Sequence, residues 1–335
     1  MRGTRGDRGV GGSARFPRRG RRWALVAASS AAAVLLLALV LRFTDRAQVA
    51  ATIAQTEPAW LGASIGCFLA YQWFRMRRTA LLLAMPPSGR LFATLCLQGG
   101  ANDLVLPAGT GDAALVYLLK RLHGAGYAQG LASLVAARVA DLGLFTLLFA
   151  ALALGSSGAL PPMLRAIMAS LAALLVATGV GLWSVGRMGR WGASAPARSR
   201  RARLAAALER ISAELREVHA RRIYPPLLLQ STAMWIAMYL SYVALLRALD
   251  APLSDWQVLL LYVLVFPVDL SPVKGAANFG THEGVWFVAL RVLGVEAGAA
   301  AALSVATHLL ILAKLLASVA IGAVWLAAAP VRVSR

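Results

Sequence analysis

Long apolar runs constrain this chain more than any other feature of its sequence. A helix of about 20 mostly apolar residues is long enough to cross the hydrocarbon layer of a bilayer. Six runs approach or exceed that length with few charges: 23–41, 58–74, 127–154, 162–185, 226–249 and 298–328. The composition agrees, because 59% of the 335 residues are hydrophobic and 14% are charged, against about 45–50% and about 25% in soluble domains. We therefore expect an all-α, polytopic transmembrane helical bundle.

The chain is strongly basic, with 34 Lys and Arg residues against 14 Asp and Glu residues and a net charge of +20. The basic residues gather outside the apolar runs, which is typical of cytoplasmic loops and of contact with anionic headgroups. No zinc-finger, helix-turn-helix or aromatic RNA-binding pattern accompanies the charge, so we expect no nucleic-acid partner. The two cysteines, Cys67 and Cys96, have no metal-ligand spacing, and we expect neither a metal nor a cofactor.

The Arg-rich stretches predict the topology. Three of them are expected to be cytoplasmic: the disordered tail 1–22, the loop 75–90 and the insertion 186–225. Residues 23–41 then form the first span, although small residues at 47–51 leave a cleaved signal peptide as the alternative. The final tail, 329–335, is also placed in the cytoplasm. We expect a multi-pass protein of the cell (plasma) membrane with both termini inside.

The insertion 186–225 contains one helical pattern. Apolar residues recur at alternating steps of four and three between Leu204 and Val218, which gives one apolar stripe with a basic opposite face. Two interpretations stay open: a helix lying in the cytoplasmic membrane interface, or a solvated helix packing on the bundle.

Two segments, 90–124 and 256–293, are apolar at both ends and broken in the middle. An even number of crossings must connect the cytoplasmic stretches before and after the first segment, so it must return to the side from which it enters. The same count places both ends of the second segment outside. We therefore predict two re-entrant hairpins that enter the membrane from opposite faces.

A weak internal similarity agrees with this topology. The stretches "AGYAQGLAS" (125–133) and "LGVEAGAAA" (293–301) share two glycines and an alanine when Gly126 is aligned with Gly294. A glycine-flanked acid precedes each stretch. We infer an inverted repeat, which in transporters places discontinuous helices at the interface of the two halves.

Ionisable groups inside the breaks need a partner or water. Asp269, Lys274 and Glu283 would together cost about 8–10 kcal/mol if they faced lipid. One interpretation is internal pairing, of Lys274 with Glu283 or Asp269. The other is contact with a lipid headgroup or a coupling proton in a wet cavity. In the last span His308 and Lys314 are six residues apart and are not expected to share a face.

Most of the candidate residues lie in the two predicted hairpins. Two more, Arg138 and Asp141, lie on the span that follows the first hairpin. The lipid-headgroup or proton-coupling candidates are Asn102, Asp103, Asp112, Lys120, Arg121, Arg138, Asp141, Asp269, Lys274, Asn278, His282 and Glu283. The residues expected to break the hairpin helices are Pro107, Gly111, Pro272 and Gly280. Arg138 and Asp141 could simply pair with each other on one helix face.

At these motifs the sequence resembles the membrane region of lysylphosphatidylglycerol synthases, whose stand-alone form is called a flippase-like domain. The resemblance covers about 23–328. The stretches that carry it are "NDLVLPAGTGDAALVYLLKR" (102–121), "ARVADL" (137–142) and "SPVKGAANFGTHEG" (271–284). The chain departs from the family pattern at three positions: Leu115 in place of an arginine, Ala137 in place of an acid and His282 in place of a more basic residue.

The resemblance implies an integral membrane protein that translocates an amphipathic phospholipid or glycolipid between leaflets. Lys274 would bind phosphate, while Asp112 and Glu283 would balance that charge or carry a proton. The synthases have a soluble transferase domain after the membrane region, and the chain stops seven residues after its last span, so we do not expect lysyl transfer. The expected partners are anionic or glycosylated membrane lipids, with a soluble transferase or a second copy also considered.

Two alternatives remain open. One is a membrane-embedded enzyme or accessory subunit that acts on a lipid-linked saccharide or an aminoacylated lipid, although no phosphate-loop, nucleophile-elbow or metalloprotease motif is present. The other is a basic scaffold that organises anionic lipid through 1–22 and 198–222.

Overall fold

The structure is a computed structural model. It describes residues 34–35, 37–40, 42–105, 110–155, 170, 173, 177, 200–269 and 276–328. Within these ranges every regular element is a helix and no strand is present. The all-α fold expected from the apolar runs is confirmed.

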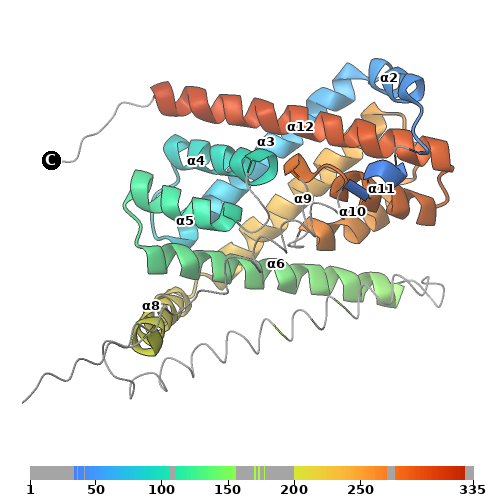
Figure 1. Ribbon diagram of the computed structural model, residues 1–335. Helices are drawn as coiled ribbons and strands as arrows, with labels where there is room; N and C mark the ends of the chain where they lie inside the picture. Colours follow the sequence, from blue (N-terminus) through green and yellow to red (C-terminus); the bar gives the residue numbers. More distant parts are fainter. Residues whose placement is uncertain are drawn as a thin grey trace, which may run out of the picture.

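Two helices of 25 residues, α3 (Pro58–Leu82) and α9 (Tyr224–Ala248), pack extensively against each other and form the centre of the bundle. Both begin with proline in the first turn, where its missing N–H would have no intrahelical partner. Two longer helices, α6 (Tyr127–Gly155) and α12 (Ala297–Ala328), lie on opposite sides of this pair (Figure 1).

The remaining helices form two interrupted segments. In the first, α4 (Gly89–Gly100) continues into a short π-helical stretch, η1 (Ala101–Val105), and the chain then resumes as α5 (Thr110–His123). In the second, α10 (Asp255–Asp269) is followed by the 3₁₀ turn η3 (Ala276–Asn278) and by α11 (Thr281–Val292). Figure 1 shows the two segments at opposite ends of the bundle, and η1 contacts η3. The two interruptions therefore meet inside the molecule.

Apolar packing holds each interrupted segment to the long helices. One core joins α9, α10, α11 and α12 around buried residues such as Leu245, Trp286 and Leu290. A second core joins α3, α4 and α5 around Met76, Leu95 and Leu119. Helices α4 and α12 approach closely, because a Cβ on Gly322 would lie 3.0 Å from the carbonyl oxygen of Ala93. This close packing fixes α4 against α12.

Two further helices lie at the edge of the bundle. Helix α2 (Arg46–Ala54) is capped by the Asp45 side chain and contacts α12. Helix α8 (Arg200–Ala220) lies in the basic insertion, as its apolar pattern predicts, and Val218 at its end is buried against Leu82, Ala137 and Leu227. Arg221 donates hydrogen bonds to two carbonyls at the end of α3. The end of this helix therefore packs on the bundle.

Three described helices are long and apolar enough to cross a membrane: α6, α9 and α12. They match the predicted spans 127–154, 226–249 and 298–328. Most of the predicted spans 162–185 and 23–41 lies outside the described residues. The predicted loop 75–90 is wrong over 75–82, because α3 continues to Leu82 and only a short connection leads to α4. Arginines that we assigned to a cytoplasmic loop after residue 74 therefore lie within a helix.

Candidate functional site

A cavity of about 460 Å³ lies between the long helices and the two interruptions. All four long helices, α4, η1, α5, η3 and α11 contribute to its lining. Its wall contains four cations, three carboxylates and two histidines: Arg75, Arg78, Arg138, Lys314, Asp103, Asp112, Asp141, His282 and His308. So many charges inside an otherwise apolar bundle require water, partners or a polar ligand.

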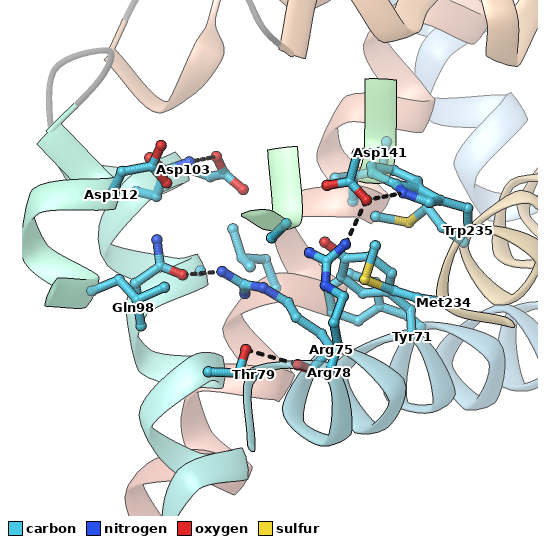
Figure 2. Close-up of a pocket in the computed structure, with 18 of the residues that line it drawn as sticks. Tyr71, Arg75, Arg78, Thr79, Gln98, Asp103, Asp112, Asp141, Met234 and Trp235 are labelled. Carbon is cyan, nitrogen blue, oxygen red and sulfur yellow. Dashed lines mark hydrogen bonds and ion pairs between the residues drawn. The ribbon is translucent and has the colours of Figure 1, made fainter. Parts of the chain in front are cut away.

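Helix α3 provides one continuous face of the cavity. Phe68, Tyr71, Arg75, Arg78 and Leu82 recur at steps of three and four and all line it. The two arginines extend from this face into the cavity in different directions, one toward α4 and the other toward α6 (Figure 2).

Arg75 is held by neutral oxygen atoms. Its guanidinium donates to the side-chain amide oxygen of Gln98 and, at 3.4 Å, to the carbonyl oxygen of Leu95 and to Gln72. Among the described residues no carboxylate lies within salt-bridge distance of it. Gln98 in turn donates to the carbonyl of Gly111 at 3.1 Å, at the start of α5. Arg75 is thus a positioned cation whose charge no described acid neutralises.

Arg78 is neutralised by an acid that is distant in sequence. Its Nη1 lies 2.5 Å from Asp141 Oδ1 on α6, and both side chains are almost fully buried. The same carboxylate oxygen accepts a hydrogen bond of 2.7 Å from the indole of Trp235 on α9, and Ser231 accepts from Arg78 at 3.4 Å. The pair joins α3, α6 and α9. Removing one partner of such a pair leaves an uncompensated buried charge.

The first interruption presents its acids to the open cavity. Asn102 donates to Asp103 at 2.6 Å, and Asp112, in the first turn of α5, accepts from Arg138 on α6 at 3.3 Å. The side chains of Asp112 and Arg138 are 46% and 47% exposed. Gly111 permits this arrangement, because a Cβ there would overlap the side-chain amide of Asn102. The acids here remain accessible from the cavity.

The second interruption buries its acid. Glu283 Oε2 accepts from the backbone N–H of Gly280, which caps α11 at φ +80°, and Oε1 lies 2.7 Å from His308 Nδ1 on α12. The other ring nitrogen of His308 lies 3.0 Å from the carbonyl oxygen of Ala277. His282 stacks on His308 with the ring centres 4.4 Å apart. Helices α11 and α12 are joined through this cluster.

Lys314 is buried on α12, with 5% of its surface exposed. Its ammonium donates to the hydroxyls of Ser64 on α3 and Ser241 on α9, at 3.0 Å each. It also lies 5.7 and 5.8 Å from the ring centres of Phe68 and Tyr242, within range of a cation–π interaction.

The structure brings together most of the predicted site residues. Those that line the cavity or its wall are Asn102, Asp103, Asp112, Arg138, Asp141, Asn278 and His282, with Glu283 directly behind them. The possible pairing of Arg138 with Asp141 is wrong, because each pairs with another helix instead. Lys120 lies over the ring of Tyr127 and Arg121 bonds Tyr117, and neither is among the cavity residues.

Some predictions cannot be compared with the structure. Pro107, Pro272 and Lys274 lie outside the described residues, and for Asp269 only the helical backbone is described. Gly111 and Gly280 are at the starts of α5 and α11, as helix breaks require. No group of three potential metal ligands occurs among the described residues.

Several site residues were missed by the sequence analysis. Arg75 and Arg78 were assigned to a loop, yet they continue the face formed by Phe68 and Tyr71, and that three-and-four spacing was a readable signal. His308 and Lys314 were expected on different faces, but both line the cavity, which spans more than one face of α12. Gln98 carried no signal of its own.

The arrangement can hold an anion. A guanidinium without a paired acid, and a lysine bonded only to hydroxyls, favour a negatively charged group between them. The adjacent exposed acids and amides offer hydrogen-bond acceptors and donors for a polar headgroup.

The fold, the apolar spans and the motifs can be compared with known proteins. No curated protein and no solved structure matches the chain. A protein-family model described as "Lysylphosphatidylglycerol synthase TM region" matches residues 25–322, which is most of the chain. The chain is therefore a membrane protein that belongs to the lysylphosphatidylglycerol synthase transmembrane-region family.

Proposed function

We propose that the protein moves an amphipathic lipid with an anionic or glycosylated headgroup between the leaflets of the cell membrane. The observation that carries this proposal is the charged cavity, which lies where two helix interruptions meet in an apolar bundle. Irregular backbone at membrane depth is tolerated where it lines a water-filled cavity or is buried in protein. The headgroup of the lipid occupies this cavity while the acyl chains of the same lipid stay in the hydrocarbon layer.

Arg75 is the principal headgroup ligand in this proposal. Its guanidinium faces the cavity and its described partners are all neutral, so an incoming phosphate supplies the opposite charge that they lack. Lys274, at the second interruption, supplies a second cation as the sequence predicts. Asp103 and Asp112 balance these charges and accept hydrogen bonds from hydroxyl groups of the lipid.

The proposed transport uses two similar halves that enter the membrane from opposite faces. Each half contains a long helix, two short helices around an interruption, and another long helix. Gly124 and Gly294 have positive φ values and lie three residues before α6 and α12 begin. This register pairs Gly124, rather than the Gly126 used in the sequence comparison, with Gly294. Exchange of two such halves between equivalent conformations would open the cavity to each face in turn.

The direct test is lipid movement in proteoliposomes. Purified protein would be reconstituted with a fluorescent phosphatidylglycerol, a fluorescent glucosyl lipid or a fluorescent phosphatidylcholine, and transfer to the outer leaflet followed by chemical quenching. The assay is run with and without an imposed proton gradient. We expect the anionic or the glycosylated lipid to move faster than it does in empty vesicles. Arg75→Ala should slow it about 10- to 100-fold, the loss of one charged hydrogen bond. Arg216→Ala, on the exposed face of α8, is the matched control.

Two outcomes would sink the proposal. One is that no lipid moves faster than in empty vesicles under any gradient. The other is that Arg75→Ala, Lys274→Ala and Glu283→Gln all match the unmodified protein. Turnover of a lipid-linked saccharide by the same preparation would instead favour the alternative of a membrane-embedded enzyme or accessory subunit.

A further inference from the structure

The pair formed by Glu283 and His308, behind the second interruption, carries one proton more than a neutral imidazole beside an ionised carboxylate would. His308 Nε2 lies 3.0 Å from the carbonyl oxygen of Ala277, and a carbonyl can only accept, so this nitrogen carries a proton. His308 Nδ1 lies 2.7 Å from Glu283 Oε1. A proton must lie between these two atoms as well, because two lone pairs at this distance repel each other. The pair therefore exists as imidazolium with carboxylate or as neutral imidazole with carboxylic acid.

These two forms contain the same number of protons, and the pair is neutral overall in both. Glu283 is 1% exposed and His308 is 2% exposed, so a neutral pair suits the site better than a single charge would. Removal of one proton leaves one N–H on His308 for two acceptors. The carboxylate makes the stronger bond to it, so the contact with Ala277 is the one that is lost.

The contact with Ala277 stabilises a turn whose backbone is strained. Ala277 and Asn278 have φ values of 49° and 60°, in the left-handed region that costs residues with a Cβ about 1–2 kcal/mol. The turn belongs to η3, which contacts η1 across the cavity. Loss of the His308 contact therefore frees the turn at the point where the two interruptions meet.

Among the residues that the structure describes, few other ionisable groups face this pair. On α11, His282 stacks on His308 and its Nε2 is buried with no partner among the described atoms. Like charges in stacked rings repel, so protonation of His282 is disfavoured whenever His308 is an imidazolium. On α12, Lys314 lies six residues away and bonds two hydroxyls.

The elements that pack against this cluster add little charge. η3 contributes Phe279, whose ring contacts His308, and the side-chain amide of Asn278. η1 carries Asp103, bonded to Asn102. At the start of α10, Asp255 pairs with Arg247, and Asp269 ends that helix.

We propose that the Glu283–His308 pair is a proton-binding site that fastens the turn at Ala277, so that release of its proton to cavity water unfastens the second helix interruption. The inference deepens the proposed function, on which it rests for its role: it assigns the coupled ion as a proton and places its site. One proton leaves and the pair changes from neutral to singly negative.

Glu283→Gln gives a direct test, because it imitates the protonated pair. The amide oxygen of glutamine accepts from Gly280 and its NH₂ donates to His308 Nδ1, so His308 keeps its N–H for Ala277. His308→Phe has the opposite effect, since it removes the contact at every pH. His219→Gln, on α8, is the matched control for loss of an imidazole far from the site.

The measurement is hydrogen–deuterium exchange of residues 276–281 in the full-length protein, in detergent micelles, between about pH 5 and 8.5, where histidine-containing sites titrate. Rates are divided by the intrinsic chemical rate at each pH. In the unmodified protein and in His219→Gln, protection should fall roughly five- to tenfold as the pH rises, the equivalent of one hydrogen bond. Glu283→Gln should stay protected throughout, and His308→Phe should be unprotected throughout.

The proposal is overturned if the unmodified protein shows no change beyond the intrinsic rate, or if Glu283→Gln responds to pH as the unmodified protein does. Protection of His308→Phe at low pH would also overturn it. Exchange requires no lipid movement, so this result is independent of the proteoliposome assay. If exchange follows the expected pattern while no lipid moves, the proton site stands and the transport proposal fails.

Discussion

The two helix interruptions use similar residues in opposite ways. At the first, Asp112 is 46% exposed and meets Arg138 at 3.3 Å. At the second, Glu283 is 1% exposed and both of its oxygens have a partner. An accessible acid can exchange its partner for a ligand at little cost, whereas a buried and satisfied acid cannot. Under the proposed function, the acid of the first interruption is therefore the one that can contact a ligand, whereas the acid of the second holds the shape of the site.

The largest expected difference follows from removing each acid. Glu283→Ala leaves His308 and the Gly280 N–H without their acceptor and should lower the free energy of unfolding by about 3–5 kcal/mol. Asp112→Ala removes a solvated pair and should cost roughly 0–1 kcal/mol. Denaturant unfolding in mixed micelles measures both. Equal losses would contradict the assignment of one buried and one accessible acid.

Replacing the glycine at each interruption by alanine should give smaller losses of stability, and the two losses should have different physical causes. Gly111→Ala forces a Cβ into Asn102 and should cost about 1–3 kcal/mol. Gly280→Ala places a Cβ on a backbone with φ +80° and should cost about 1–2 kcal/mol.

A second substitution separates these two causes. Truncation of the obstructing side chain in Gly111→Ala/Asn102→Ala should recover most of the loss, because the neighbours couple. No such rescue is expected for Gly280→Ala, whose cost lies in its own backbone. The unfolding midpoint of each variant decides between them.

The left-handed turn offers a gain in stability. Ala277→Gly keeps the carbonyl that His308 contacts and removes the Cβ penalty at φ 49°, so it should stabilise the protein by about 0.5–1 kcal/mol. The same change at Ala113, inside α5, should destabilise it by a similar amount. Thermal unfolding of the two variants in parallel provides the check. A loss at both positions would show that the turn is not strained.

The smallest effect concerns the starts of the two long helices that follow the interruptions. Glu296 accepts from the backbone N–H groups of Gly298 and Ala299 at the start of α12, and these bonds lower the pKa of its carboxyl below 4.5. The corresponding acceptor at α6 is the neutral side chain of Gln129, which the Gly126 N–H reaches at 3.4 Å. Only the stability of the first turn of α12 should therefore depend on pH.

The sign follows from the lowered pKa. Stabilisation by Glu296 is complete above pH 4.5 and is lost as the pH falls through the folded-state value. Exchange protection in the first turn of α12 should decrease over that window, while the first turn of α6 remains unchanged. Glu296→Gln should abolish the difference; its persistence in that variant would identify another group as the cause.

The sequence predicts elements well where a local pattern determines them. The long apolar runs at α6, α9 and α12 and the glycines at the two helix interruptions are local signals, and the structure agrees with them. The partners of the charged groups are another matter. Asp141 binds Arg78, which is 63 positions away, and Glu283 binds His308, 25 positions away. Sequence spacing indicates which residues share a helix face but gives no information on which faces meet.

The end of α3 shows how two physical signals can conflict. An apolar run followed by "RMRR" is typical of a span ending at the cytoplasmic side. The three-and-four spacing of Arg75 and Arg78 with Tyr71 instead indicates a continuing helix with a polar face. Arg78 pairs with Asp141 and Arg75 bonds the neutral amide of Gln98, so both guanidiniums have partners inside the bundle, which decides in favour of the second.

The crossing of α3 and α9 has a mechanical consequence. At one point Ser64 and Ser241 each donate to the other's backbone carbonyl at 2.8 Å, and Lys314 donates to both hydroxyls. Small side chains bring the backbones together there, and the reciprocal bonds prevent them from sliding. A joint held at one point acts as a fulcrum. A small rotation about Ser64 and Ser241 produces its largest displacement at the far ends of the two helices, and near the far end of α3 Arg78 pairs with Asp141 of α6 in the wall of the cavity.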